Sequence, residues 1–307
     1  MKYVVLLLIL LVFLSGCVGQ TPTAKIFRDP ITIPDESYII SPRDPYADST
    51  VNMNFEVHNL GTQTVDEVEL YFIPSNFEVI TITCSSPSQT IENGCVLSNM
   101  EKNDVRIVSV VLKAPSKDII KSPTNMAVRY QLKYDYTGYR NALIPVVDDI
   151  TVKQPKNPYT PSNPSDGPIE LEFEPPKQGE IKKGKQVIDL RWVKKDIPFE
   201  LKMKLNHVGS KDLGTVKNLI IPVGQLKIDM DGVDLVRIDS EELSCDLKQY
   251  GNSLVSEEDI EVPSELSCNL ISTKQDFRGF YNMKLEASFS YTYIITKTEE
   301  FTVRPRS

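Results

Sequence analysis

This sequence has few histidines and no clusters of basic residues, and each of these features excludes a class of function. The 307 residues include two His, and no HExxH, GxSxG or Gly-rich phosphate loop occurs. The usual zinc, serine-hydrolase and nucleotide chemistries therefore lack their motifs. The net charge is −8 and no basic stripe is present, which argues against nucleic acid because that affinity depends on Lys and Arg neutralising phosphates. We expect no enzyme activity, no cofactor, no metal site and no nucleic-acid partner.

The two histidines fall in corresponding turns of the two halves of the chain, as His58 and His207. They are one residue out of step, which argues against a shared metal or triad role. We interpret both as polar turn residues. Catalysis by scattered carboxylates stays open, because a glycan-cleaving pair cannot be recognised without knowing which residues meet in space.

One acidic group, Asp229, Asp231 and Asp234 around Gly232, superficially resembles an oxygen-rich calcium loop. An EF-hand needs a longer loop that is closed by Glu and flanked by helices, whereas alternating apolar residues flank this one. We interpret Asp231-Gly232 as the two-residue turn of a β-hairpin, and a weak surface calcium site stays open. The acidic stretch 257–261 is interpreted as a solvated loop.

Long apolar runs are also absent, except at the start of the chain. Val4 to Leu14 are unbroken apolar residues after Lys2, which is long enough for a signal peptide but short of the roughly 20 residues of a spanning helix. The run ends in Leu14-Ser15-Gly16-Cys17, which resembles the lipobox of bacterial and archaeal lipoproteins. This resemblance implies cleavage before Cys17 and lipid attachment to its thiol, and two acyl chains would hold the protein on the outer face of the cell membrane. The alternative is a secreted protein in which Cys17 is incidental.

Four further cysteines lie in two local pairs, Cys84 with Cys95 and Cys245 with Cys268. An even number in an exported chain predicts disulfides, because the compartment permits oxidation. A metal site would need CxxC-like or Cys/His spacing, which neither pair has. Closing a loop of this size stabilises the fold by about 3 kcal/mol in the chain-entropy model, whose mechanism is disputed.

Apolar and polar residues alternate with period two in both halves of the chain, which predicts strands with one face in a core. Corresponding features recur in order, including Tyr134-x-Tyr136 and Tyr291-x-Tyr293. Short strands between Gly, Pro, Asn and Ser turns predict an all-β chain of two tandem immunoglobulin-like β-sandwiches. The predicted divisions are a signal peptide (1–16), a lipidated tether (17–30), a first sandwich (31–152), a Pro-rich spacer (153–168) and a second sandwich (169–307). We expect the two sandwiches to fold independently and to stand in line on a stiff spacer.

The tyrosines give a further hint, because 13 Tyr against one Trp provide many amphipathic rings that could line a carbohydrate or protein surface. Their positions in alternating strands instead predict that Tyr130, Tyr134 and Tyr291 fill the edge of a core. Tyr139, beside Gly138, is the one we expect to be exposed.

The segment FEVHNLGTQTVDEVEL resembles the opening of CARDB-type immunoglobulin-like modules of bacterial and archaeal surface proteins. The pattern is a strand, the turn Asn59-Leu60-Gly61, and a second alternating strand that contains Val65, Val68 and Leu70. The second half departs from it, because it reads Asn206-His207-Val208-Gly209. The resemblance implies an extracellular, non-catalytic module.

These observations predict a lipid-anchored, extracytoplasmic binding, adhesion or cell-envelope scaffold with a protein or glycan partner at the cell surface. One alternative is an envelope enzyme that uses carboxylates to hydrolyse glycans. The other is a solute-binding or accessory subunit of a transporter, although the chain lacks the βαβ alternation of such proteins.

The paired cysteines yield the first testable prediction. Peptide mapping without reductant should join Cys84 to Cys95 and Cys245 to Cys268, because each pair is close in sequence. A bridge between the two halves of the chain would contradict this pairing.

Overall fold

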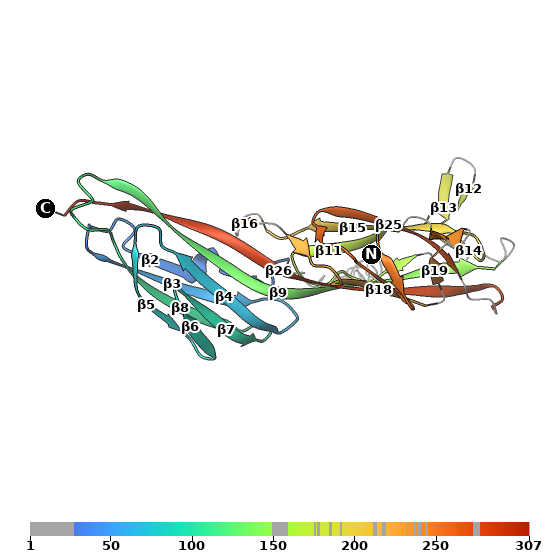
Figure 1. The fold of residues 1–307 in the computed structure, drawn as a ribbon, viewed down its shortest axis with the longest axis horizontal. Helices are drawn as coiled ribbons and strands as arrows, with labels where there is room; N and C mark the ends of the chain where they lie inside the picture. Colours follow the sequence, from blue (N-terminus) through green and yellow to red (C-terminus); the bar gives the residue numbers. More distant parts are fainter. Residues whose placement is uncertain are drawn as a thin grey trace, which may run out of the picture.

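The computed structural model describes residues 28–148 and 159–306, apart from short gaps at 175, 177–178, 184–185, 191, 211–213, 217–218, 232, 236, 239–240, 243–244 and 273–276. The predicted signal peptide, Cys17 and residues 153–158 of the spacer lie outside these ranges. The molecule is elongated, with two lobes joined by a long two-stranded ribbon (Figure 1). Within the described ranges, no helix is long and apolar enough to cross a membrane.

Lobe 1 is a sandwich built mainly from the chain before residue 114. One sheet has the order β1-β3-β8-β5, with β2 also beside β3, and the other contains β4, β7 and β6. The elements are β1 (Ile31–Thr32), η1 (Asp35–Ser37), β2 (Tyr38–Ser41), β3 (Thr50–Asn59), β4 (Val65–Ile73), β5 (Glu78–Cys84), β6 (Ser88–Ile91), β7 (Gly94–Met100) and β8 (Val105–Lys113).

Lobe 2 repeats this plan with the sheet β11-β15-β25-β19 on one side and β22-β23-β18 on the other. Its elements are β10 (Thr160–Pro161), β11 (Ile169–Glu174), β12 (Gly179–Lys183), β13 (Gln186–Leu190), β14 (Val193–Lys194), β15 (Phe199–His207), β16 (Thr215–Val216), β17 (Ile220–Ile221), β18 (Leu226–Met230), β19 (Val233–Leu235), β20 (Arg237–Ile238), β21 (Glu241–Glu242), β22 (Lys248–Tyr250), β23 (Ser253–Val255), β24 (Ile260–Glu261) and β25 (Ser264–Ser272).

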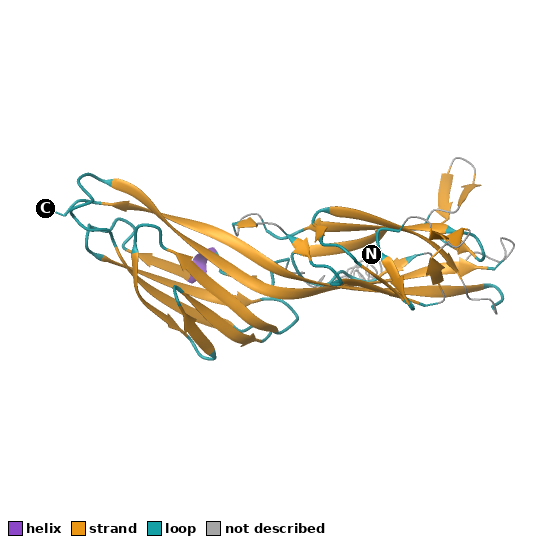
Figure 2. Ribbon diagram, viewed as in Figure 1, coloured by secondary structure: helices purple, strands orange, loops and turns teal. Residues whose placement is uncertain are grey.

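The ribbon consists of β9 (Thr124–Val147) and β26 (Phe280–Val303), which are 24 residues long each. They pair in antiparallel register over their whole length, from Phe280 opposite Val147 to Val303 opposite Thr124. One half of β9 also pairs with β4, and one half of β26 also pairs with β18. The second sheets of both lobes thus merge into one 11-stranded sheet that runs through the molecule (Figure 2).

The predicted all-β class with two β-sandwiches is confirmed, and its cause is the alternation of side chains. In β3, Val51, Met53, Phe55 and Val57 are fully buried while the residues between them face outward. Pleating sends successive side chains to opposite faces, so period-two sequences fill the space between two sheets. Tyr130, Tyr134 and Tyr291 are buried as predicted, and Tyr139 is 50% exposed.

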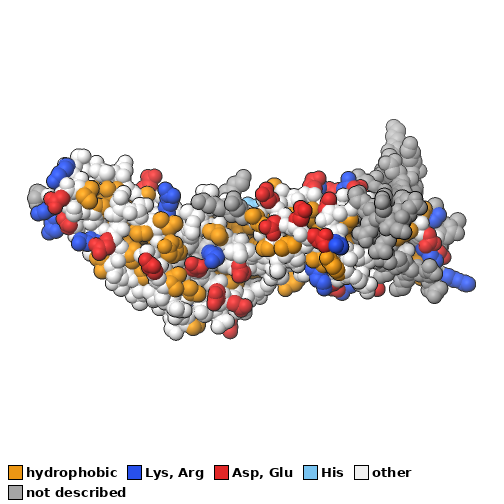
Figure 3. Space-filling view, in the orientation of Figure 1, with side chains coloured by type: hydrophobic (Ala, Val, Ile, Leu, Met, Phe, Trp, Pro, Cys, Tyr) orange, Lys and Arg blue, Asp and Glu red, His pale blue; other side chains and the backbone are white. Residues whose placement is uncertain are grey.

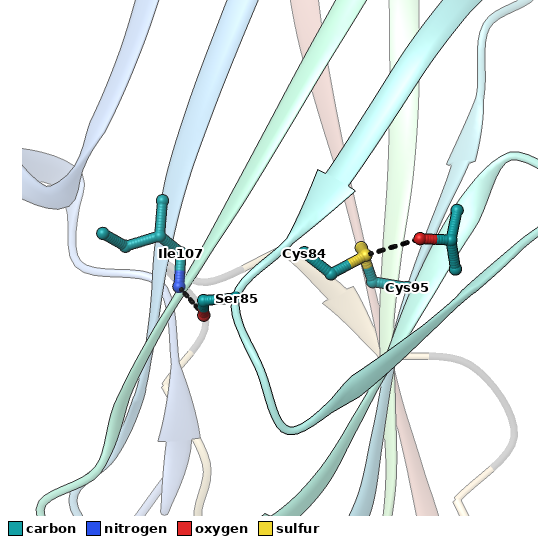
Figure 4. Close-up of a disulfide and its surroundings, with 5 residues drawn as sticks. Cys84, Ser85, Cys95 and Ile107 are labelled. Carbon is teal, nitrogen blue, oxygen red and sulfur yellow. Dashed lines mark hydrogen bonds between the residues drawn. A yellow bond between two sulfur atoms is a disulfide. The ribbon is translucent and has the colours of Figure 1, made fainter.

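Both predicted disulfides are present. Cys84 of β5 bonds to Cys95 of β7 and so joins the two sheets of lobe 1 (Figure 4). The chain that follows Cys84 is held to the neighbouring strand, because the Ile107 N–H donates to Ser85 Oγ at 2.8 Å. Cys245 bonds to Cys268 of β25, and this bond ties the segment before β22 to the other sheet of lobe 2.

The lobes do not follow the sequence divisions at 152 and 169. The first lobe takes the C-terminal half of β26 as a strand, and the second lobe takes the C-terminal half of β9. The described part of the predicted spacer is itself structural, because Thr160 and Pro161 pair with Leu143 and Ala142 of β9. Pro is tolerated there because an edge strand has backbone groups that need no partner.

This exchange of strands corrects the expectation of independent units. Residues 30–152 expressed alone leave the C-terminal half of β9 without partners, and residues 168–307 lack the strand that lies beside β26. We predict that neither half unfolds cooperatively as a monomer, whereas the co-expressed halves form a stable pair. Thermal unfolding and analytical ultracentrifugation would measure this. Two separately stable monomers would contradict it.

Candidate functional site at the junction of the lobes

The junction is built from two equivalent turns, one in each lobe. β1 enters lobe 1 with Ile31 opposite Asn59, and β11 enters lobe 2 with Ile169 opposite His207. The Leu60 N–H donates to the Pro30 carbonyl at 2.7 Å, and the Val208 N–H donates to the Pro168 carbonyl at 2.8 Å. The turns after β3 and β15 therefore correspond, with His207 in the place of Asn59 rather than of His58. The offset of one residue that the sequence indicates is confirmed by this register.

Each turn is held by an aspartate that precedes the entering strand of the other lobe. Asp166, just before β11, accepts hydrogen bonds from the backbone N–H and the hydroxyl of Thr62 in lobe 1, the latter at 2.8 Å. Asp29, just before β1, accepts one from the Ser210 N–H in lobe 2 at 2.6 Å. Hydrogen bonds to charged groups are stronger than neutral ones, so the two contacts latch the lobes reciprocally. We call them the Asp166 latch and the Asp29 latch.

Glycine is required in both turns because the latches approach the backbone closely. A Cβ on Gly61 would lie 3.0 Å from Asp166 Oδ2 and 2.6 Å from the Pro30 side chain. A Cβ on Gly209 would lie 2.8 Å from Asp29 Oδ1 and 2.7 Å from the Tyr293 hydroxyl. The Gly of the Asn-x-Gly pattern therefore has a packing role at the junction, which the sequence does not reveal.

The Asp29 latch continues into a buried polar cluster. The Tyr293 hydroxyl donates to Asp29 Oδ1 at 3.5 Å and lies 2.8 Å from His207 Nε2. Burial raises the pKa of the Asp29 carboxyl above its ordinary value, although the Ser210 N–H and the charge of His207 oppose this. His207 is thus part of a hydrogen-bonded cluster, which corrects its interpretation as a simple turn residue. His58 lies apart from the junction, with Nε2 3.2 Å from a Glu56 carboxylate oxygen.

Four tyrosines of the ribbon fill the centre of the junction. Tyr134 lies opposite Tyr293 and Tyr136 opposite Tyr291, with ring centroids 5.6 and 6.3 Å apart. Burial raises the pKa of all four phenols well above the ordinary value, and the charge of Asp166 adds to this at Tyr136. The phenols are therefore neutral at physiological pH. They act as packing groups rather than as proton carriers, and of the four the Tyr293 hydroxyl donates to Asp29 while the Tyr291 hydroxyl accepts from the Ile169 N–H.

A surface depression with a volume of about 850 Å³ lies in lobe 2. Its lining includes the predicted acidic loop, with Glu257 2.9 Å from Lys248 Nζ and accepting from the Tyr250 hydroxyl at 2.8 Å. These hydrogen bonds lower the pKa of the Glu257 carboxyl. A glycan hydrolase needs one carboxyl with a raised pKa to protonate the leaving group, so Glu257 has the opposite property.

The predicted hairpin around Asp231 is wrong, because β18 and β19 belong to different sheets. The turn carries the chain across lobe 2, and Gly232 lies outside the described residues. Asp229 instead pairs with Lys227 Nζ at 2.8 Å and accepts from Ser253, and both contacts lower its pKa. Among the residues with described side chains, no group of three or more His, Cys, Asp or Glu is placed to hold a metal ion.

No family model and no curated protein matches this chain. Among solved structures, one similar chain is in the crystal structure of the collagen adhesin from S. aureus, with 9% sequence identity. The match covers 91% of this chain and 90% of that chain with a TM-score of 0.15. A score this low supports no conclusion about fold or function, so the functional argument depends on the residues themselves.

The raised pKa of Asp29 predicts how stability changes with pH. The folded state binds this proton more tightly than the unfolded chain, so the contribution of Asp29 to the free energy of unfolding falls as pH rises above about 4. Asp29→Asn should therefore cost most stability at low pH and less towards neutral pH, because the amide accepts from Ser210 without a buried charge. Urea unfolding between pH 3 and 7 measures the difference.

Two control variants separate this effect from others. His207→Gln removes the other titratable partner of the cluster. Glu257→Gln should show a smaller effect of opposite sign, because the pKa of that exposed carboxyl is lowered. A difference between Asp29→Asn and the wild type that does not change with pH would contradict the prediction.

Proposed function

We propose that this protein is a non-catalytic scaffold or adhesion module, anchored by lipid on Cys17 to the outer face of the cell membrane. The observation that carries the proposal is the continuous ribbon of β9 and β26, which makes two sandwiches into one stiff unit. A binder or scaffold gains from a fixed distance and orientation between surfaces. An enzyme that acts on small soluble substrates gains nothing from it.

The junction supports the same role. Asp29 and Tyr293 are buried and hydrogen-bonded to one another and, through Tyr293, to the half-buried His207. His207 also lines a depression of lobe 2 together with Glu261, but its Nε2 lies 2.8 Å from the Tyr293 hydroxyl. Such a cluster stabilises an arrangement of lobes rather than a transition state. The lowered pKa of Glu257 weighs against a role of this carboxyl as the acid of glycan hydrolysis in the depression that it lines.

The position of the proposed anchor follows from the first described residues. Arg28 pairs with Glu170 of lobe 2 at 3.2 Å, and Asp29 reaches Ser210, so the chain enters the fold at the junction. Residues 18–27 span at most about 36 Å when extended. A lipid on Cys17 would therefore hold the molecule near its middle, with a lobe on either side of the attachment point.

Replacement of the lipidated thiol tests the proposal. Cys17→Ser should move the protein from the membrane fraction to the soluble fraction and remove the lipid mass, since two acyl chains are what hold it. Detergent phase partition and intact-mass measurement record both changes.

The double variant Cys84→Ser and Cys95→Ser is the matched control, because it removes two cysteines and their disulfide from the folded part and should leave the partition unchanged. Wild-type protein that enters the aqueous phase without lipid mass would refute the anchor.

A further inference from the structure

The middle of the outer face of the first sheet of lobe 1 carries few charged side chains. The residues that point outward from β3, β5 and β8 include Asn52, Asn54, Thr81, Thr83, Ile107 and Ser109. Ile107 is 51% exposed, and Ile39, which lies beside Asn54 on β2, is 64% exposed. The charged side chains on this side are Glu56, whose carboxylate lies 3.2 Å from His58 Nε2, and at the rim Glu78 and Lys113, which lie opposite each other on β5 and β8. We call this surface the lobe 1 face.

The equivalent surface of lobe 2 is highly charged. Asn59 corresponds to His207, so Asn52 corresponds to Glu200 and Asn54 to Lys202. By the same alignment Glu56 corresponds to Lys204. On the neighbouring strands Ile107 lies opposite Glu56 and Glu265 lies opposite Lys204, so Ile107 corresponds to Glu265. Ion pairs cover this face, including Lys204 with Glu174 at 2.7 Å, Lys204 with Glu265 at 3.3 Å and Lys202 with Glu200 at 3.3 Å. The two lobes thus place opposite kinds of side chain at the same positions of the same fold.

Because the two lobes share one fold, the difference between their outer faces is not required by folding. A sheet face that meets only water keeps solubility through mixed charges, as lobe 2 does. The core of lobe 1 does not depend on its outward residues, so its sparsely charged face needs another explanation. Figure 3 shows hydrophobic side chains exposed on both lobes in this view. On the lobe 1 face the exposed apolar side chains include Ile39 and Ile107, and exposed apolar surface is typical of an interaction site.

We propose that a second copy of this chain docks on the lobe 1 face, to form a two-fold symmetric dimer by sheet-on-sheet packing. The inference goes beyond the proposed function and does not depend on the lipid anchor. Two copies of a chain with net charge −8 repel each other, and a surface with few charged side chains is where they meet at least cost. Amide and hydroxyl groups both donate and accept, so Asn54 and Ser109 can pair with their own copies across a two-fold axis.

The chemistry of the face disfavours other partners. A glycan surface would present aromatic rings, but on the strands of this sheet Tyr38 and Phe55 point towards the core. An anionic membrane surface would require clustered Lys or Arg, and Lys113 lies at the rim, at the end of β8.

Four strands about 4.8 Å apart and about seven residues long present roughly 450 Å² per copy. Specific interfaces bury about 800 Å² per partner, so the dimer is a weak and reversible one.

Sedimentation velocity of residues 18–307, which include every described residue, tests the proposal from 1 to 500 µM. We expect a concentration-dependent dimer. Asn54→Glu places two carboxylates against each other across the axis and should raise the dimer dissociation constant at least tenfold. Ile107→Glu is a second variant that should do the same from the neighbouring strand. Both side chains are exposed, and unchanged thermal unfolding would show that the fold is kept.

Lys202→Glu is the matched control, because it introduces the same side chain at the position of lobe 2 that corresponds to Asn54. It changes the net charge by more than Asn54→Glu does, yet should leave the dissociation constant unchanged. A monomer throughout the concentration range would overturn the proposal. So would a dimer that resists both lobe 1 variants, or one that Lys202→Glu weakens to the same degree.

Discussion

The antiparallel pairing of β9 with β26 is the constraint on which the rest of the structure depends. Each strand belongs to one sandwich along its first half and to the other along its second, and the pairing has no break between them. Side chains therefore alternate in one continuous phase through both cores, since a slip of one residue would reverse every one of them. The lobes cannot separate without breaking backbone hydrogen bonds in the middle of a sheet, so the molecule behaves as one body with two cores.

The two latches complete this constraint at the junction. A ribbon of two strands twists easily, and it fixes the distance between the lobes better than their rotation. Asp166 and Asp29 each lie at the start of one lobe and accept hydrogen bonds from a turn of the other lobe. The two contacts therefore restrict the rotation of one lobe relative to the other about the ribbon. Burying two carboxylates is costly unless backbone donors meet them, and the Thr62 and Ser210 N–H groups meet that need. The raised pKa of Asp29 shows that the compensation there is incomplete.

The sequence predicts the strands, the cores and the disulfides, because each depends on local patterns. The alternation around Tyr134 and Tyr291 and the spacing of Cys84 and Cys95 are visible without knowledge of the fold. The exchange of strands is not, since Tyr134-x-Tyr136 is equally compatible with a strand that stays in its own sandwich. The prolines near Thr160 indicate an extended chain correctly, but an extended chain can be a free spacer or an edge strand. Asp231-Gly232 likewise predicts a turn and not which sheet follows it, and the role of His207 depends on Asp29, far away in sequence.

The two lobes share the same sheet plan and are fixed relative to each other, but the side chains on their outer faces differ. Substitutions of buried residues are poorly tolerated in both lobes, because protein interiors are close-packed. The pairing of β9 with β26 also fixes which side chains face the cores. Outward positions are free of this restriction, and there Asn54 and Lys202 differ although their strands are equivalent. Because the ribbon and the latches fix the lobes, the direction of the lobe 1 face is fixed relative to Arg28, where the chain enters the fold. The two faces therefore keep a fixed distance and angle to each other, which is the property that distinguishes one rigid body from two flexibly linked modules.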